Sequence, residues 1–322
     1  MKKTITFFFI VMNCFLSPAQ NYKEWIRKAD SCYAKENYKT SVDYYEKAFK
    51  IEQKSAAHLY KASCSASMSS EKKKAFKWLN LAIDNGYKSI AYLQFDWDLK
   101  SLHSDKQWKK TIDHLQKKLD VLEVNYDKPL QKELLAIYTE DQGIRQEFMR
   151  VYKANGLTVN KKVDSIGKVM QFKDSINLIK VMKILDEKGW IGSDVVGAEA
   201  SQTLYLVIQH ADLVYQQKYL PMMREAVKKG NAKPANLAYL EDRVALREGG
   251  KQIYGSQIYT NPSTKKNFIA PLEDPDNVDK RRAEVGLGPL SDVALKSNIV
   301  WNVEEYKKEL PELIELINKK KQ

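Results

Sequence analysis

The residues best suited to chemistry lie between positions 201 and 257, where polar side chains are dense on segments that also look apolar enough for a core. His210 stands near the start of this stretch, in the run QHAD at 209–212. A histidine oriented by a carboxylate can act as a general base near neutral pH. We therefore predict that His210 is a candidate general base, oriented by one of three carboxylates: Asp174, Asp212 or Asp242. The candidate catalytic set is His210, Asp242 and Asp174.

Arginine and amide side chains around these acids are candidates for binding a ligand. A guanidinium can bind a carboxylate or phosphate through two parallel hydrogen bonds, and Arg145, Arg243 and Arg282 are the candidates for this role. Ser256, in the turn YGSQ, is the candidate nucleophile. The other candidate ligand-binding residues are Asp141, Gln209, Gln216, Tyr254 and Gln257.

The same residues also fit a purely structural role. A histidine at a helix end is favoured by the helix dipole and can be satisfied by a neighbouring carboxylate. The pairs Asp141/Arg145 and Asp242/Arg243 could form a buried ion-pair network that fixes how helices pack. The sequence lacks the GxSxG, HExxH and phosphate-loop motifs, and one histidine among scattered carboxylates is a poor zinc site. We expect neither a metal nor a cofactor, and the sequence leaves enzyme and binding protein both open.

Helices are predicted to position most of these side chains. Apolar residues recur at helical spacing over long segments, whereas the polar–apolar alternation of 252–259 indicates a strand that pairs with 267–272. The helix at 198–209 is apolar nearly all round, which predicts a central, buried helix. We thus expect a mostly α chain, with an α-rich domain over 128–322 that contains a small β-hairpin. Its helices are expected at 130–154, 161–186, 198–209, 213–229, 234–247, 278–285 and 303–319.

An internal period of 34 residues runs through 22–89. Positions 34 residues apart carry side chains of the same size class, small at Ala29/Ser63, Ser41/Ala75 and Ala48/Ala82, and large at Tyr45/Leu79. This pattern resembles the tetratricopeptide repeat, a helix–turn–helix unit of that length, and residues 90–119 look like a degenerate third unit. The resemblance implies a short helical-repeat array over 22–124 that binds an extended peptide or a helix in its groove, which Tyr33, Tyr60 and Lys61 could line.

A second resemblance covers about residues 130–290. The motifs D-Q-G-x-R at 141–145, Gly189-Trp190, QHAD at 209–212, Asp242-Arg243 and YGSQ at 254–257 precede an arginine-rich helix and Gly286-Leu287. Together they resemble an uncharacterised bacterial domain of unknown function. The resemblance implies one domain built around these polar residues and supplies no activity.

The N-terminus predicts export. Lys2 and Lys3 precede a short apolar run at 5–16, and small residues at 17 and 19 favour cleavage after Ala19. Residues 1–19 are therefore expected to be a bacterial signal peptide, too short to span a membrane as a helix. The mature chain would be periplasmic or secreted. Cys32 and Cys64 remain, and the sequence does not decide whether they form a disulfide.

Charge and composition narrow the partners. The chain has 322 residues and a formal net charge of +12 that is spread thinly, with runs of three lysines at 72–74 and 319–321. Such a surface attracts polyanions weakly, so an acidic envelope polymer is a possible partner, and no motif indicates nucleic-acid binding. We expect no stable membrane span. The leading hypothesis is an envelope binding or scaffold protein with a peptide or protein partner. The alternative is a hydrolase or transferase that uses His210, and a structural interaction protein is the third.

Overall fold

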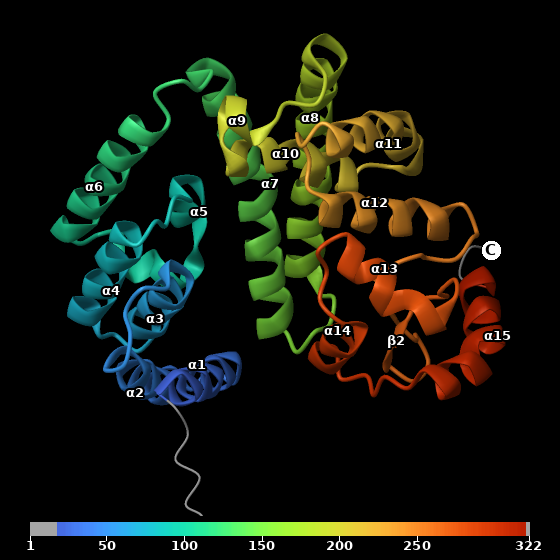
Figure 1. The fold of residues 1–322 in the computed structure, drawn as a ribbon, viewed down its shortest axis with the longest axis horizontal. Helices are drawn as coiled ribbons and strands as arrows, with labels where there is room; N and C mark the ends of the chain where they lie inside the picture. The colour runs from blue at the N-terminus through green and yellow to red at the C-terminus, as the bar shows by residue number, and fades with distance from the viewer. Residues whose placement is uncertain (1–17, 320–322) are drawn as a thin grey trace, which may run out of the picture. The chain divides into compact units, whose positions relative to one another are not determined.

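The computed structural model describes residues 18–319, and the expected signal peptide lies outside this range except for its last two residues. The chain divides into two compact units, residues 1–122 (unit 1) and 123–322 (unit 2). Both units are α-rich, and in residues 18–319 the strands form one small two-stranded antiparallel sheet, which lies in unit 2 (Figure 1). The predicted fold class, mostly helical with a small hairpin, is therefore confirmed.

Unit 1 contains two consecutive helix pairs whose packing repeats. Helices α1 (Pro18–Ala34) and α2 (Tyr38–Phe49) pack together, as do α3 (Ala56–Met68) and α4 (Lys72–Asp84). Ser41 Oγ donates to the Ala29 carbonyl at 2.9 Å, and Ser63 Oγ donates to the Ala75 carbonyl at 2.9 Å. The two bonds join equivalent positions of the two pairs, 34 residues apart. The serine lies on the second helix of the first pair and on the first helix of the second pair. The pairs are therefore equivalent units, while the tetratricopeptide assignment stays a prediction.

The rest of unit 1 closes the end of this array. It comprises α5 (Ile90–Phe95), the 3-10 turn η1 (Trp97–Leu102) and α6 (Lys106–Leu122). Tyr60 donates to Asp96 and Tyr33 to Asp98, so acids of the η1 region hold tyrosines of α3 and α1. Lys61 pairs with Asp30 at 3.0 Å. The side chains that we expected to line a peptide groove are thus engaged within the unit. Cys32 and Cys64 are free thiols in this structure.

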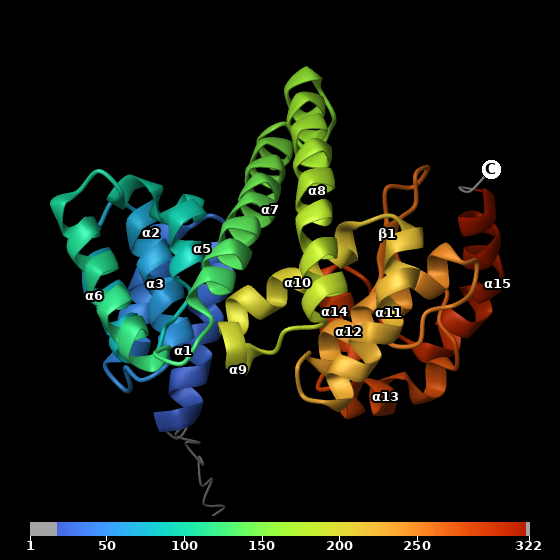
Figure 2. The same ribbon diagram turned by 90° about the horizontal axis from the view of Figure 1, so that it is seen from above.

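Unit 2 begins with a long helical hairpin. Helices α7 (Lys128–Ala154) and α8 (Lys161–Lys188) lie side by side in both views (Figures 1 and 2). Asp127 caps α7 through the Leu130 amide, with proline in the first turn, and Asn160 caps α8. Gly189, at a φ of +74°, ends α8. The hairpin therefore starts and stops at the residues that local sequence chemistry favours.

A central helix packs against this hairpin. It is α10 (Ala198–His210), which contacts α7, α8, the short α9 (Ser193–Val196), α11 (Leu213–Lys228) and α12 (Pro234–Arg247). Leu204 and Ile208 of α10 are fully buried in the same apolar cluster as Leu134 of α7 and Val181 of α8. Burial on all sides explains why α10 carries apolar residues nearly all round.

The C-terminal part of unit 2 differs in detail from the expectation. The hairpin strands are β1 (Ile258–Thr260) and β2 (Asn267–Ile269), with Ile258 opposite Ile269. The expected strand over 252–259 is therefore mostly a loop, because its amides are bound by Asp242 instead of a partner strand. The turn η2 (Pro275–Asn277) leads to α13 (Val278–Glu284), the unexpected α14 (Leu290–Lys296) and α15 (Val303–Lys319). Among residues 18–319 no helix has the length and apolar character to cross a membrane.

Candidate functional site

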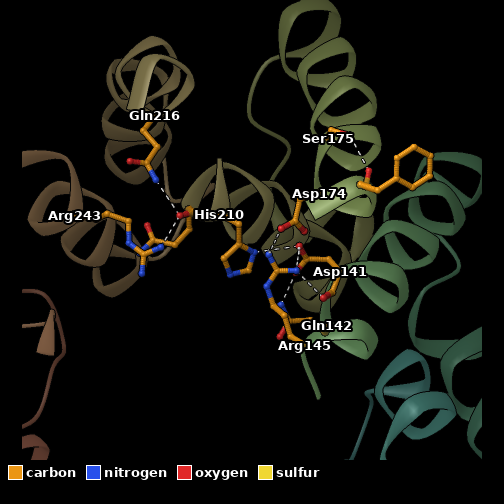
Figure 3. Close-up of polar contacts among 10 residues, drawn as sticks. Asp141, Gln142, Arg145, Asp174, Ser175, His210, Gln216 and Arg243 are labelled. Atoms are coloured by element: carbon orange, nitrogen blue, oxygen red, sulfur yellow. Dashed lines mark hydrogen bonds and ion pairs between the residues drawn. The ribbon is translucent and has the colours of Figure 1, made fainter. Parts of the chain in front are cut away.

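His210 pairs with a carboxylate across the interface between α10 and α7. Its Nδ1 lies 3.1 Å from Asp141 Oδ1 (Figure 3). The His210 side chain is 21% exposed, whereas the Asp141 side chain is only 1% exposed. An ionised carboxylate only accepts hydrogen bonds, so Asp141 selects the imidazole tautomer that carries its proton on Nδ1. Nε2 of His210 is then the basic nitrogen, on the more exposed residue of the pair.

Two neighbours on α7 hold Asp141 in place. Gln142 Nε2 donates to Asp141 Oδ2 at 2.6 Å, and Arg145 Nη1 lies 3.0 Å from Asp141 Oδ1. Burial alone would raise the pKa of Asp141, but the hydrogen bond and charge of His210, with help from Arg145 and Gln142, outweigh it and lower the pKa. Asp141 is therefore an ionised carboxylate in a fixed position.

Asp174 reaches this group through Arg145. Its Oδ2 accepts from Arg145 Nη2 at 2.9 Å, while its Oδ1 is buried without a hydrogen-bond partner among the described residues. Arg145 thus bridges α7 and α8 by contacting both Asp141 and Asp174. The sequence predicted Asp174 as a direct partner of His210. In the structure, Asp174 instead contacts Arg145, which in turn contacts Asp141.

A second group surrounds the carbonyl of Gln209, the residue before His210. This oxygen accepts from Gln216 Nε2 at 2.9 Å and from Arg243 Nη1 at 2.8 Å. Arg243 Nε also donates to Gln257 Oε1 at 3.3 Å. The expected ligand-binding residues Gln209, Gln216, Arg243 and Gln257 are therefore brought together beside His210, on α10, α11, α12 and the loop that precedes β1.

Asp242 has a different place from the one expected for it. The buried carboxylate accepts from the amides of Ile253 at 2.6 Å, Tyr254 at 2.9 Å and Ser256 at 2.9 Å. Burial raises the pKa of Asp242, although these three amides and the Ser256 hydroxyl oppose the rise. All of these partners lie in the 253–256 loop, so the geometry makes Asp242 a loop anchor and does not bring it to the imidazole of His210.

The hydroxyl of Ser256 is also committed to this loop. It accepts from Gln257 Nε2 at 2.9 Å and interacts with Asp242. A serine nucleophile needs a hydrogen bond to its base, and His210 makes its described bond to Asp141. The structure therefore does not assemble a serine–histidine pair from Ser256 and His210.

Tyr254 and Arg282 complete the loop from its other side. Arg282, only 2% exposed, donates from Nη1 to the Tyr254 carbonyl and from Nε to the Gly288 carbonyl, both at 2.6 Å. Burial lowers the pKa of the Arg282 guanidinium. The geometry thus gives Arg282 a role in holding the loop, away from the His210–Asp141 pair.

Sequence reasoning missed three residues that contribute to this region. Gln142 was part of a recognised motif but had no assigned role. Arg247 follows Arg243 by one helical turn, a spacing that could have indicated a shared face, and its Nη1 donates to the Ala211 carbonyl at 2.8 Å. Gln252 spans the loop, donating to the carbonyls of Gln257 and Ala270 and accepting from the Gln257 amide. Nothing in its local sequence indicated this contact.

Comparison with known proteins gives one match. A family model described as a family of unknown function (DUF6624) matches residues 128–299, which include every residue of the site. No curated protein and no solved structure matches the chain. The match starts at the first residue of α7 and agrees with the predicted uncharacterised domain. Because the family is of unknown function, the chemistry of the site has to be inferred from its geometry.

Proposed function

The chain belongs to the DUF6624 family of unknown function, and we propose that this domain is a hydrolase or transferase with His210 as its general base. The observation that carries the proposal is the His210–Asp141 pair, in which a partly exposed imidazole is oriented by a buried carboxylate. Histidine with an orienting carboxylate is the usual arrangement of a general base in hydrolytic enzymes. The sequence suggested Asp174, Asp212 or Asp242 as the carboxylate that orients His210. The proposal assigns this role to Asp141 instead.

The proton path follows from the contacts. Nε2 of His210 accepts the proton of a water or a substrate hydroxyl as that oxygen attacks. The imidazolium keeps its Nδ1 proton, which points at Asp141, and then returns the Nε2 proton to the leaving group. Asp141 stays ionised throughout because its pKa is lowered, and Arg145 and Gln142 prevent it from rotating away. A water or a substrate hydroxyl supplies the attacking oxygen in this path, because the Ser256 hydroxyl accepts from Gln257 and makes no described bond to His210.

Two activated esters test the proposal: 4-nitrophenyl acetate and 4-nitrophenyl phosphate, incubated with the full chain. We expect His210→Ala to lower the rate constant for one of them by about 100-fold or more, which is the usual contribution of a general base. The matched control is His114→Ala. His114 also pairs with an aspartate, Asp84 at 2.9 Å, but on an exposed surface of unit 1.

The outcome is decided by the comparison of the two histidines. Equal rates for the wild-type chain and His210→Ala, or a wild-type rate no higher than that of free imidazole at the same concentration, contradict general-base catalysis by His210. Asp141→Asn should reduce the rate less than His210→Ala, because the base remains but loses its orientation.

The second candidate function is an exported binding or scaffold protein of the bacterial envelope. It is favoured by the equivalent hydrogen bonds of the two helix pairs in unit 1, which repeat at the 34-residue spacing of tetratricopeptide arrays. Arrays of this kind bind proteins or peptides, and the net charge of +12 favours acidic polymers as additional partners. The two proposals are compatible because they use different units. Processing of the N-terminus tests export.

A further inference from the structure

Arginines approach His210 from two sides. Arg243 and Arg247 of α12 donate to the carbonyls of Gln209 and Ala211, which are the residues immediately before and after His210, each at 2.8 Å. Arg145 of α7 contacts Asp141, the partner of His210. In Figure 3, Arg243 and Arg145 lie on opposite sides of the imidazole. Three guanidinium groups thus contact the residues that flank or pair with His210.

The charge of Arg243 is not neutralised within the described chain. No carboxylate of residues 18–319 lies within 4.0 Å of its guanidinium, and both of its hydrogen bonds go to neutral oxygens, Gln209 O and Gln257 Oε1. Two acids of the site, Asp141 and Asp174, pair with Arg145 instead. A partly buried charge without a counter-ion is costly, which makes such a group a receptor for an anion.

The electrostatic surroundings of Arg243 agree with this reading. Burial lowers the pKa of its guanidinium, and the charges of Arg247 and Arg145 lower it further, while Tyr205 and Tyr259 oppose this shift. Arg247 and Arg145 are therefore close enough to Arg243 to repel its charge. An oxyanion placed among them would relieve that repulsion and gain charge-assisted hydrogen bonds.

We propose that this site binds an oxyanion group of its substrate, a carboxylate or a phosphoryl group, at Arg243 beside His210. The proposal rests on the proposed function and deepens it by naming the substrate class. Arg243 uses Nη1 and Nε for hydrogen bonds within residues 18–319, which leaves Nη2 as the donor for the anion. The guanidinium is fixed by Gln209 and Gln257, which removes much of the entropy that an unrestrained arginine would lose on binding.

A purely structural role for Arg243 makes a different prediction. Cations near a helix C-terminus stabilise the last carbonyls, and Arg243 does contact the end of α10. That role requires a donor but no anion. It therefore predicts that His210 does not respond to added oxyanions, whereas the proposed site predicts a saturable response at His210 that depends on Arg243.

The experiment follows the imidazole Cε1–H resonances of the full chain by NMR while inorganic phosphate or acetate is added at constant ionic strength and pH. The chain has four histidines, so His58, His103 and His114 are internal references. We expect a saturable shift at His210 alone. Arg243→Gln should raise the half-saturating concentration about 10- to 100-fold, the range for loss of one charged hydrogen-bonding group.

Arg224→Gln is the matched control, because it removes one arginine charge from the exposed Arg224 side chain, which pairs with Glu241 at 2.8 Å. It should leave the half-saturating concentration unchanged. If Arg243→Gln does not fold, Arg243→Lys keeps the charge but loses the planar fork, and should bind more weakly than the wild-type chain. The anion that saturates at the lower concentration identifies a phosphoryl or a carboxylate substrate.

Three results would overturn the inference: no saturable shift of His210 with either anion, parallel shifts of all four histidines, or an unchanged response in the Arg243 variants. Failure of the proposed function is distinguishable from these. Anion binding at His210 without ester turnover removes only the catalytic proposal, and ester turnover without anion binding removes only the oxyanion site.

Discussion

At the scale of single residues, the pairing of His210 with Asp141 separates two roles that the sequence had grouped together. Asp141 orients the histidine, whereas Asp242 gives its carboxylate to three amides of one loop. Both carboxylates are buried, yet their pKa values shift in opposite directions because Asp141 faces cations and Asp242 faces neutral amides. Charge partners, more than burial, thus distinguish the carboxylate that orients His210 from the structural one.

The pH dependence of stability should report the Asp141 pair. The pKa of Asp141 is lower in the folded chain than its ordinary value of 3.8, so the carboxylate stabilises the fold fully above pH 3.8 and loses this effect as the pH falls below it. We expect Asp141→Asn to lower the free energy of unfolding by about 2–3 kcal/mol at pH 6. The difference between the two proteins should shrink below pH 3.8.

Urea unfolding followed by circular dichroism, at several pH values from 6 to 3, measures this difference. Asp113→Asn is the control for loss of a carboxylate, because Asp113 forms an exposed pair with Lys109. A difference between wild type and Asp141→Asn that stays constant over the whole range would argue against an ionised, paired Asp141.

At the scale of elements, the 252–257 loop joins the C-terminal part of unit 2 to the site. Asp242 of α12 binds its amides, Arg282 of α13 binds the Tyr254 carbonyl, and Gln257 at its end contacts Arg243. Gly255 makes this path possible, with a φ of +68° and a position where a Cβ atom would lie 2.9 Å from Leu290 Cδ1. A residue with a side chain would have to adopt a strained backbone and displace Leu290 of α14.

Gly255→Ala is therefore expected to be more destabilising than another glycine substitution with similar backbone strain. Gly286 has a φ of +76° but no atom within 4 Å of the added Cβ, so Gly286→Ala measures the backbone strain alone. We expect about 1 kcal/mol for Gly286→Ala and about 2–4 kcal/mol for Gly255→Ala, from thermal or urea unfolding. Equal costs for the two variants would mean that Leu290 moves aside freely.

At the scale of the whole molecule, two compact units carry separate candidate functions. The described site residues all belong to unit 2, and the repeated helix pairs all belong to unit 1. The family match covers unit 2 from α7 to beyond α14. A catalytic domain joined to a partner-binding array is the organisation that the two proposals together describe.

Export is the property of the whole chain that is simplest to test. The basic residues Lys2 and Lys3, the apolar run at 5–16 and the small residues before position 20 predict cleavage after Ala19. We expect the chain produced in a bacterial host to appear in the periplasmic or culture fraction. Its intact mass, measured by mass spectrometry, should equal that of a chain starting at Gln20. Replacing Ala19 with a bulky residue should block cleavage. An uncleaved chain confined to the cytoplasm would remove the envelope proposal.

The sequence by itself determined most of the secondary structure and the residues worth inspecting. Apolar periodicity and caps are local properties, so the expected helices agree with α7, α8 and α10 to α12 within a few residues. The alternation at 252–259 misled because a polar–apolar pattern also fits a loop whose amides are bound by a side chain. The short helices α9 and α14, which have little periodicity to read, were missed as elements.

Only the tertiary structure decided which residues act together. His210 and Asp141 are 69 positions apart, and they meet because α10 packs across α7. No local signal distinguished Asp141 from Asp174, Asp212 or Asp242 as the partner of His210, since all four are aspartates and their spacing does not show which helix faces meet. Helix packing sets that choice, and packing depends on how buried surfaces from distant segments fit together. The same packing puts the uncompensated charge of Arg243 beside His210, which is the basis for expecting an anionic substrate.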